Sequence, residues 1–135
     1  MTSDMKGEHP SVLVVDDEED LCWVLKNALA PDDYSVVTVN NGTEAMFQIK
    51  QRSFVIAFVD VKLPDLDGLA LVAHIREHSP NTSVVLLSGY YYAEDQIIIQ
   101  GLLNGLFSGF IAKPFDLNEV RLLARQAVVQ ASRGS

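Results

Sequence analysis

The sequence has little of several features that mark common classes of protein. Cys22 is its single cysteine, so no disulfide can form within the chain and a reducing compartment is expected. No apolar stretch approaches the ~20 residues that a membrane-spanning helix needs. Residues 1–10 are polar and lack the apolar segment of a secretion signal. We therefore expect a cytoplasmic protein that has no membrane partner.

Positive charge is also scarce in this chain. Lys and Arg number 10 against 18 Asp and Glu, which gives a formal net charge of −8. Five of the acidic residues are consecutive, from Asp16 to Asp20. A protein that binds nucleic acid directly needs a positive surface that faces the phosphates. Direct binding of nucleic acid is therefore not expected, whereas the acidic run has the character of a cation site.

The chain does have enough apolar material for one packed domain. It has 135 residues, of which 48% are hydrophobic and 21% charged, as in ordinary soluble globular proteins. No internal repeat or linker divides it. The expected organisation is a disordered N-terminal tail at 1–10, one domain at 11–130 and a C-terminal tail at 131–135.

Short apolar runs alternate with helical patterns along this domain. The runs expected to form strands are 11–15, 34–39, 54–59, 84–87 and 110–112. Apolar spacing predicts helices at 21–29, 43–51, 68–78 and 94–107, and a final helix is expected after Asp116, a plausible N-cap. Five strands that alternate with five helices predict right-handed crossovers and a parallel α/β sheet.

Polar residues stand where four of these predicted strands end. Asp16 and Asp17 follow the first strand, Asp60 the third, Ser88 the fourth and Lys113 the fifth. The carboxyl ends of parallel strands lie at one edge of the sheet, which is where open α/β sheets bind ligands. We therefore expect three carboxylates, a hydroxyl and an ammonium to meet at that edge.

Carboxylates gathered at one edge repel one another and stay ionised at neutral pH only beside a cation. Lys113 can supply one positive charge, and a hard divalent ion, most simply Mg²⁺, can supply two. Asp60 stands alone after the central strand, where its carboxylate could attack phosphorus and form an aspartyl phosphate. The metal and Lys113 would then neutralise the transferring oxygens, and Ser88 could donate a hydrogen bond to one of them.

Four segments, in this order, resemble the receiver domain of two-component response regulators. They are the strand with the acidic run at 12–20, the stretch around Asp60 at 59–68, the segment 87–89 and the segment 113–115. The resemblance covers about residues 11–130, nearly the whole chain. It implies a flavodoxin-like (βα)5 fold, with five parallel strands in the order 2-1-3-4-5 and helices on both faces of the sheet.

The resemblance also implies roles for individual residues. Asp60 would be the phosphoacceptor, Ser88 and Lys113 would bind its phosphoryl group, and Phe110 would be the aromatic residue that turns inward on activation. The implied ligands of Mg²⁺, or alternatively Mn²⁺, are Asp17, Asp16 mainly through water, Asp60, and the backbone carbonyl of Lys62. The implied phosphodonor is a sensor histidine kinase, a phosphotransfer protein or a small phosphodonor.

These residues are compatible with three functions. The first is a phosphorylation-activated signalling switch that changes its partner-binding face. The second is a pseudo-receiver, an interaction module that keeps the fold without using phosphorylation. The third is a turnover enzyme such as an aspartyl-phosphate phosphohydrolase, but Lys62 stands where such enzymes usually carry a general acid. The complete set of polar residues favours the first, a phosphoacceptor that promotes its own phosphorylation and dephosphorylation and is not a turnover enzyme.

The stretch between Ser88 and Lys113 fits the family pattern least well, because it is longer than usual. The helix predicted there is apolar all round, and Gly101 and Gly105 weaken it. One interpretation is a deformed but buried helix. The other is an exposed apolar patch, through which this fourth helix and the last strand would bind an effector or form a homodimer.

Two further aspartates lie in the loop after Asp60. Asp65 and Asp67 stand just before Gly68, where the predicted helix begins. We expect both to form the turn and to cap this helix. The sequence leaves open whether the chain is a stand-alone receiver or a part of a longer regulator.

Overall fold

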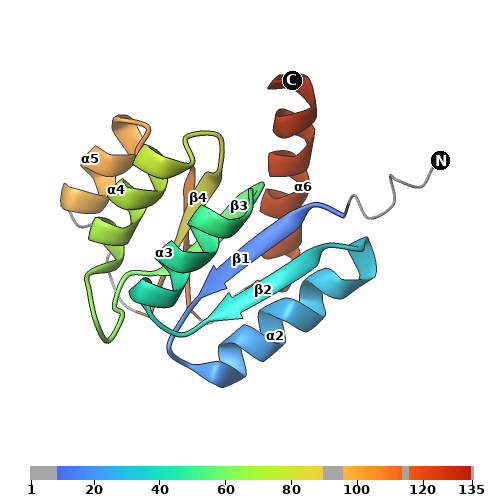
Figure 1. The fold of residues 1–135 in the computed structure, drawn as a ribbon, viewed down its shortest axis with the longest axis horizontal. Helices are drawn as coiled ribbons and strands as arrows, with labels where there is room; N and C mark the ends of the chain where they lie inside the picture. Colours follow the sequence, from blue (N-terminus) through green and yellow to red (C-terminus); the bar gives the residue numbers. More distant parts are fainter. Residues whose placement is uncertain (1–8, 90–95, 114–115, 135) are drawn as a thin grey trace.

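The computed structural model of the protein describes residues 9–89, 96–113 and 116–134. Its centre is a sheet of five parallel strands in the order β2-β1-β3-β4-β5 (Figure 1). The strands are β1 (Ser11–Val15), β2 (Ser35–Val39), β3 (Ile56–Asp60), β4 (Ser83–Ser88) and β5 (Gly109–Ala112). This architecture confirms the predicted fold class and strand order.

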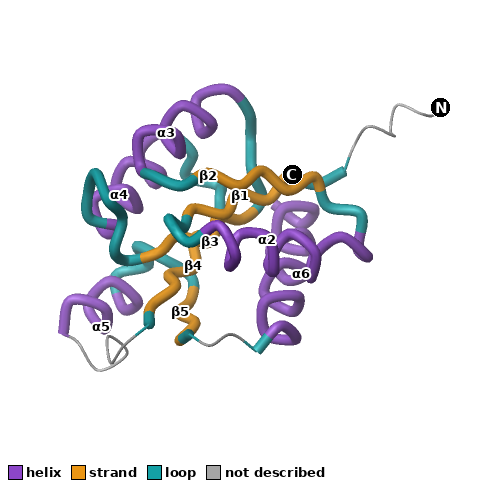
Figure 2. Tube along the Cα trace, turned by 90° about the horizontal axis from the view of Figure 1, so that it is seen from below, coloured by secondary structure: helices purple, strands orange, loops and turns teal. Residues whose placement is uncertain are grey.

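Helices cover both faces of this sheet, as Figure 2 shows. They are α2 (Glu19–Leu29), α3 (Gly42–Gln51), α4 (Gly68–His78), α5 (Gln96–Leu103) and α6 (Leu117–Gly134), with a 3-10 turn at Ala30–Asp32. In that view α3, α4 and α5 lie on one side of the sheet, and α2 and α6 lie on the other. None of the described helices is long and apolar enough to cross a membrane.

The central strands are apolar on both faces, and each face packs against helices. In β1, Leu13 and Val15 belong to the core cluster under α3 and α4, whereas Val12 and Val14 belong to the cluster under α2 and α6. All of β3 is buried in the same way. Continuous apolar runs are typical of central parallel strands covered on both faces, and here they end abruptly in carboxylates.

The helix before β5 is shorter than the sequence predicts. It ends at Leu103, because Gly105 adopts a left-handed backbone conformation with φ 73°. The Leu106 N–H donates to Gly101 O at 2.8 Å and the Gly105 N–H donates to Leu102 O at 3.2 Å. These two bonds form a Schellman cap, for which glycine is the preferred residue. The expected start of the helix, at residue 94, lies outside the described residues.

The two predicted tails have different outcomes. Residues 1–8 lie outside the described part of the chain, and His9 and Pro10 form no helix or strand. At the other end, α6 continues to Gly134. The residues expected to form a C-terminal tail from residue 131 are thus helical as far as residue 134.

Candidate functional site

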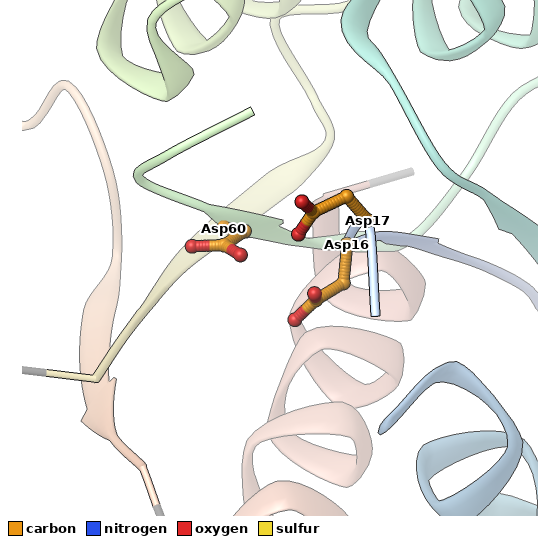
Figure 3. Close-up of side chains that lie close together, drawn as sticks. All are labelled: Asp16, Asp17 and Asp60. Carbon is orange, nitrogen blue, oxygen red and sulfur yellow. The ribbon is translucent and has the colours of Figure 1, made fainter. Parts of the chain in front are cut away.

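Three aspartates converge at the carboxyl ends of neighbouring strands. Asp16 and Asp17 follow β1, and Asp60 is the last residue of β3. Each offers a carboxylate oxygen, and these three oxygens lie within 4.8 Å of one another (Figure 3). Asp16 and Asp60 are buried and Asp17 is exposed. Because the strand order reverses between β1 and β3, the two loops diverge there and leave room for a ligand.

Asp16 is the most deeply buried member of this acidic cluster. Its Oδ1 accepts a hydrogen bond from the Glu18 N–H at 2.9 Å. Its Oδ2 lies 3.0 Å from Lys113 Nζ, yet no hydrogen bond from the described residues reaches it. Burial raises the pKa of Asp16 from 3.8 to about 6, against the lowering effect of the Glu18 N–H. The three neighbouring carboxylates offer the oxygen donors that a hard divalent cation prefers.

Lys113 carries the positive charge of the site. Its Nζ lies 3.0 Å from Asp16 Oδ2, 3.0 Å from Glu18 Oε1 and 3.2 Å from Asp60 Oδ2. Burial lowers the pKa of Lys113, but its carboxylate partners outweigh burial and hold the pKa above its ordinary value. The lysine is thus a permanent cation. Glu18 was not singled out from the sequence, although its place directly after Asp17 could have suggested it.

Strand register brings Ser88 beside this lysine. Ser88 ends β4 opposite Ala112 of β5, and the Lys113 N–H donates to Ser88 O at 2.6 Å. Ser88 is buried. The side chains surround a cavity of about 370 Å³, whose lining includes Asp17, Glu18, Asp60, Lys62, Ser88 and Lys113. The structure therefore places the predicted hydroxyl and ammonium at the same cavity as the acidic cluster.

Lys62 and Phe110 are the two remaining residues for which the sequence predicts a role. The Lys62 N–H donates to Asp60 Oδ1 at 3.1 Å, so the backbone at Lys62 is held against the carboxylate. Phe110 pairs with Leu86 across β4 and β5 and is half-buried against the core cluster under α3 and α4. Phe110 thus packs on the face of the sheet under α3 and α4 and does not line the cavity.

The two loop aspartates behave differently from each other. Asp67 caps α4, because its Oδ1 accepts the Leu69 N–H at 3.0 Å, as predicted. Asp65 does not cap that helix, and that prediction is wrong. Its carboxylate reaches the first residues of α3 instead, where it accepts hydrogen bonds from Gly42 and Thr43. A contact between segments so far apart in the chain leaves no local sequence pattern that could predict it.

Fold and site together define an α/β protein with a ligand site at the switch point of a parallel sheet. The family model for the response regulator receiver domain matches residues 12–125. The chain therefore belongs to the receiver domain family of two-component response regulators. Phosphorylation and Mg²⁺ are characteristic of this family, whose members are signalling switches rather than turnover enzymes.

Individual relatives agree with this assignment. The transcriptional regulatory protein KdpE of Staphylococcus aureus is 35% identical over 84% of the chain, which spans 48% of KdpE. A response regulator from Burkholderia pseudomallei, solved with a phosphorylated aspartic acid, calcium ion and citrate, is 28% identical with a TM-score of 0.75, covering 92% of this chain and 72% of that one.

A CheY-like receiver domain protein from Methanospirillum hungatei supports the fold alone. It is 21% identical with a TM-score of 0.85, over 94% of this chain and 99% of that one. The chain spans about half the length of KdpE.

Proposed function

We propose that this receiver is a phosphorylation-activated switch in the cytoplasm, with Asp60 as its phosphoacceptor. The observation that carries the proposal is the position of Asp60. It is buried at the end of the central strand, with Oδ2 3.2 Å from Lys113 Nζ and two further aspartates beside it. The phosphorylated aspartic acid in the similar Burkholderia protein supports this role. The donor is a sensor histidine kinase, a phosphotransfer protein or a small phosphodonor.

Phosphoryl transfer needs few protein groups beyond those at the cavity. A carboxylate oxygen of Asp60 forms the new bond to phosphorus while the bond from phosphorus to the donor breaks, and its electron pair leaves with the donor. Lys113 offsets the negative charge of the transferred oxygens, and the Ser88 hydroxyl donates to one of them. Attack by water on the same phosphorus later releases phosphate and restores the carboxylate.

The acidic cluster fits one Mg²⁺, with Mn²⁺ as an alternative. Its protein ligands would be Asp16, Asp17, Asp60 and the Lys62 carbonyl, a set of oxygen donors that such ions prefer. When bound, the ion supplies positive charge that neutralises the phosphoryl oxygens. The chain's own part is to hold the carboxylates of Asp16, Glu18 and Asp60 against the Lys113 ammonium, with Asp17 lining the same cavity.

Phosphorylation would reach a partner through β4 and β5. The phosphoryl group adds charge and acceptor oxygens beside Ser88, which draws the hydroxyl toward them. Phe110, on the neighbouring strand, would then turn inward into the space that Ser88 vacates. Leu102 and Leu103 are 40% and 75% exposed on the adjacent α5, which favours a partner-binding patch there. An effector or a second copy of the chain would bind this face.

Beryllofluoride, which mimics a phosphoryl group on aspartate, provides the direct test. Titration into the protein with Mg²⁺ should shift the backbone amide resonances of β4, β5 and the loop after Asp60. Asp60→Asn replaces the attacking carboxylate with an uncharged amide and should abolish the shift, whereas Asp67→Asn, which alters the cap of α4, should keep it. A wild-type chain that gives no shift would support the pseudo-receiver instead.

A further inference from the structure

We propose that the turn after β2, together with the first turn of α3, is a brace that sets the spacing of the two loops carrying the acidic cluster. The brace consists of Asn40, Gly42 and Thr43, together with Asp65 of the loop after β3, whose carboxylate accepts hydrogen bonds from Gly42 and Thr43. The predicted metal ligands come from the loops after β1 and β3, and the turn contacts both. The inference rests on the proposed function in one respect only, namely that these loops bind a cation.

On one side, the brace holds the loop that follows Asp60. The Asp65 carboxylate accepts three hydrogen bonds, from the Gly42 N–H at 2.8 Å, the Thr43 N–H at 2.9 Å and the Thr43 hydroxyl at 2.7 Å. These bonds, led by the one from Gly42, lower the pKa of Asp65 to about 2. The contact is therefore fully charged at neutral pH, and it also stabilises the positive N-terminus of α3.

Packing reinforces this contact. A Cβ atom added at Gly42 would lie 2.5 Å from Leu66 Cδ2, so the loop rests directly on the first turn of α3. At the base of the same loop, the Gly68 N–H donates to Val61 O at 2.8 Å. The short segment between these two fixed points contains Lys62, whose backbone N–H contacts Asp60 Oδ1. Fixing both ends of so short a loop limits the positions open to the Lys62 carbonyl.

On the other side, the brace holds the backbone at Asp16. The Asn40 side chain donates from Nδ2 to Asp16 O at 3.1 Å, and the Asp16 N–H donates to Val39 O at 3.1 Å. The end of β2 and the turn after it thus bind both backbone polar groups of Asp16. Buried Cys22 adds a second donor to the same carbonyl, from Sγ at 3.3 Å.

These contacts give the brace a positioning role rather than a chemical one. Among the described residues, none of its members lines the cavity of the acidic cluster. Metal affinity depends on how well the outer contacts orient the ligands, and losing one such contact typically weakens binding 10- to 100-fold. We expect Asp65→Asn to weaken Mg²⁺ binding by about tenfold, the lower end of that range. Thr43→Val, which removes one of three bonds, should have a smaller effect in the same direction.

The experiment compares Asp65→Asn with a matched control at the amino ends of the strands, away from the acidic cluster. Thr82 is buried and its hydroxyl donates to Phe54 O at 2.8 Å, next to the start of β3. Thr82→Val removes that bond and lowers stability without touching either loop of the site. Mg²⁺ affinity is measured by titration calorimetry on the folded chains, and amide hydrogen exchange is measured at Lys62 and Gly68 without metal.

The expected result is weaker Mg²⁺ binding and faster exchange at both amides in Asp65→Asn, with Thr82→Val equal to wild type in both. Unchanged Mg²⁺ affinity in Asp65→Asn would overturn the brace, and so would an equal loss in Thr82→Val. If the wild-type chain binds no Mg²⁺, the proposed function fails separately. The brace is then decided by exchange alone, where equal rates in Asp65→Asn and wild type overturn it.

Discussion

The acidic edge and the α5–β5 side of the molecule are built on different physical principles. At the acidic edge, charged groups are buried and fixed by ion pairs, as when Lys113 bridges Asp16 and Asp60. On the α5–β5 side, Phe107 is buried while Leu103, four residues earlier, is 75% exposed. The acidic edge is therefore held by ion pairs between specific side chains. The α5–β5 side is held by apolar packing and leaves Leu103 exposed to solvent.

Removing Lys113 should have the largest effect on stability. Lys113→Ala leaves Asp16 and Asp60 as buried carboxylates without a cation, and loss of one partner of a buried ion pair typically costs about 3 kcal/mol. Urea unfolding without metal measures the loss. Lys50→Ala, on the exposed side of α3, is the control and should change little. Equal stabilities for the two variants would show that the acidic edge needs no internal cation.

Metal-free stability should also depend on pH through Asp16. Its pKa is about 6 in the folded chain against 3.8 ordinarily, so the folded state binds the proton more tightly than the unfolded state. The stabilising contribution is complete below about pH 4 and is lost as pH rises through 6, by about 3 kcal/mol. Urea midpoints between pH 4 and pH 7.5 test this. The decline should be smaller in Asp16→Asn, and a parallel decline in both chains would contradict the assignment.

Sequence reasoning was most successful where local pattern and strand geometry act together. Apolar runs that end in Asp16, Asp60, Ser88 and Lys113 predicted which side chains meet, because parallel strands align their carboxyl ends. The role of Asp65 could not be predicted this way, since its partners lie on a helix far away in the chain. The early end of α5 was predictable in principle, because Gly105 is the residue that a Schellman cap prefers.

A methyl group at Gly101 should disturb the α5–β5 side. A Cβ atom there would overlap the Phe107 ring, which packs directly on the helix backbone. Overpacking costs typically 1–3 kcal/mol, and alanine returns up to about 1 kcal/mol of helix propensity. We expect Gly101→Ala to lose about 1 kcal/mol of stability in urea unfolding. A chain more stable than wild type would show that Phe107 is free to move aside.

Leu103 should contribute least to stability. Because its side chain is 75% exposed, Leu103→Gln should change the free energy of unfolding by less than about 0.5 kcal/mol. The same variant should weaken self-association or effector binding measured with beryllofluoride. Sedimentation of the wild-type chain and of Leu103→Gln, with and without beryllofluoride, measures association separately from stability. A large loss of stability in Leu103→Gln, without any change in association, would show that Leu103 supports the fold rather than a binding surface.

The central claim is that Asp60 accepts the phosphoryl group. After incubation with acetyl phosphate and Mg²⁺, borohydride reduction converts an aspartyl phosphate to homoserine, which peptide mass spectrometry locates. We predict homoserine at position 60 in the wild-type chain and none in Asp60→Asn. Homoserine at Asp16 or Asp17, or none anywhere in the phosphodonor-treated wild-type chain, would contradict the account.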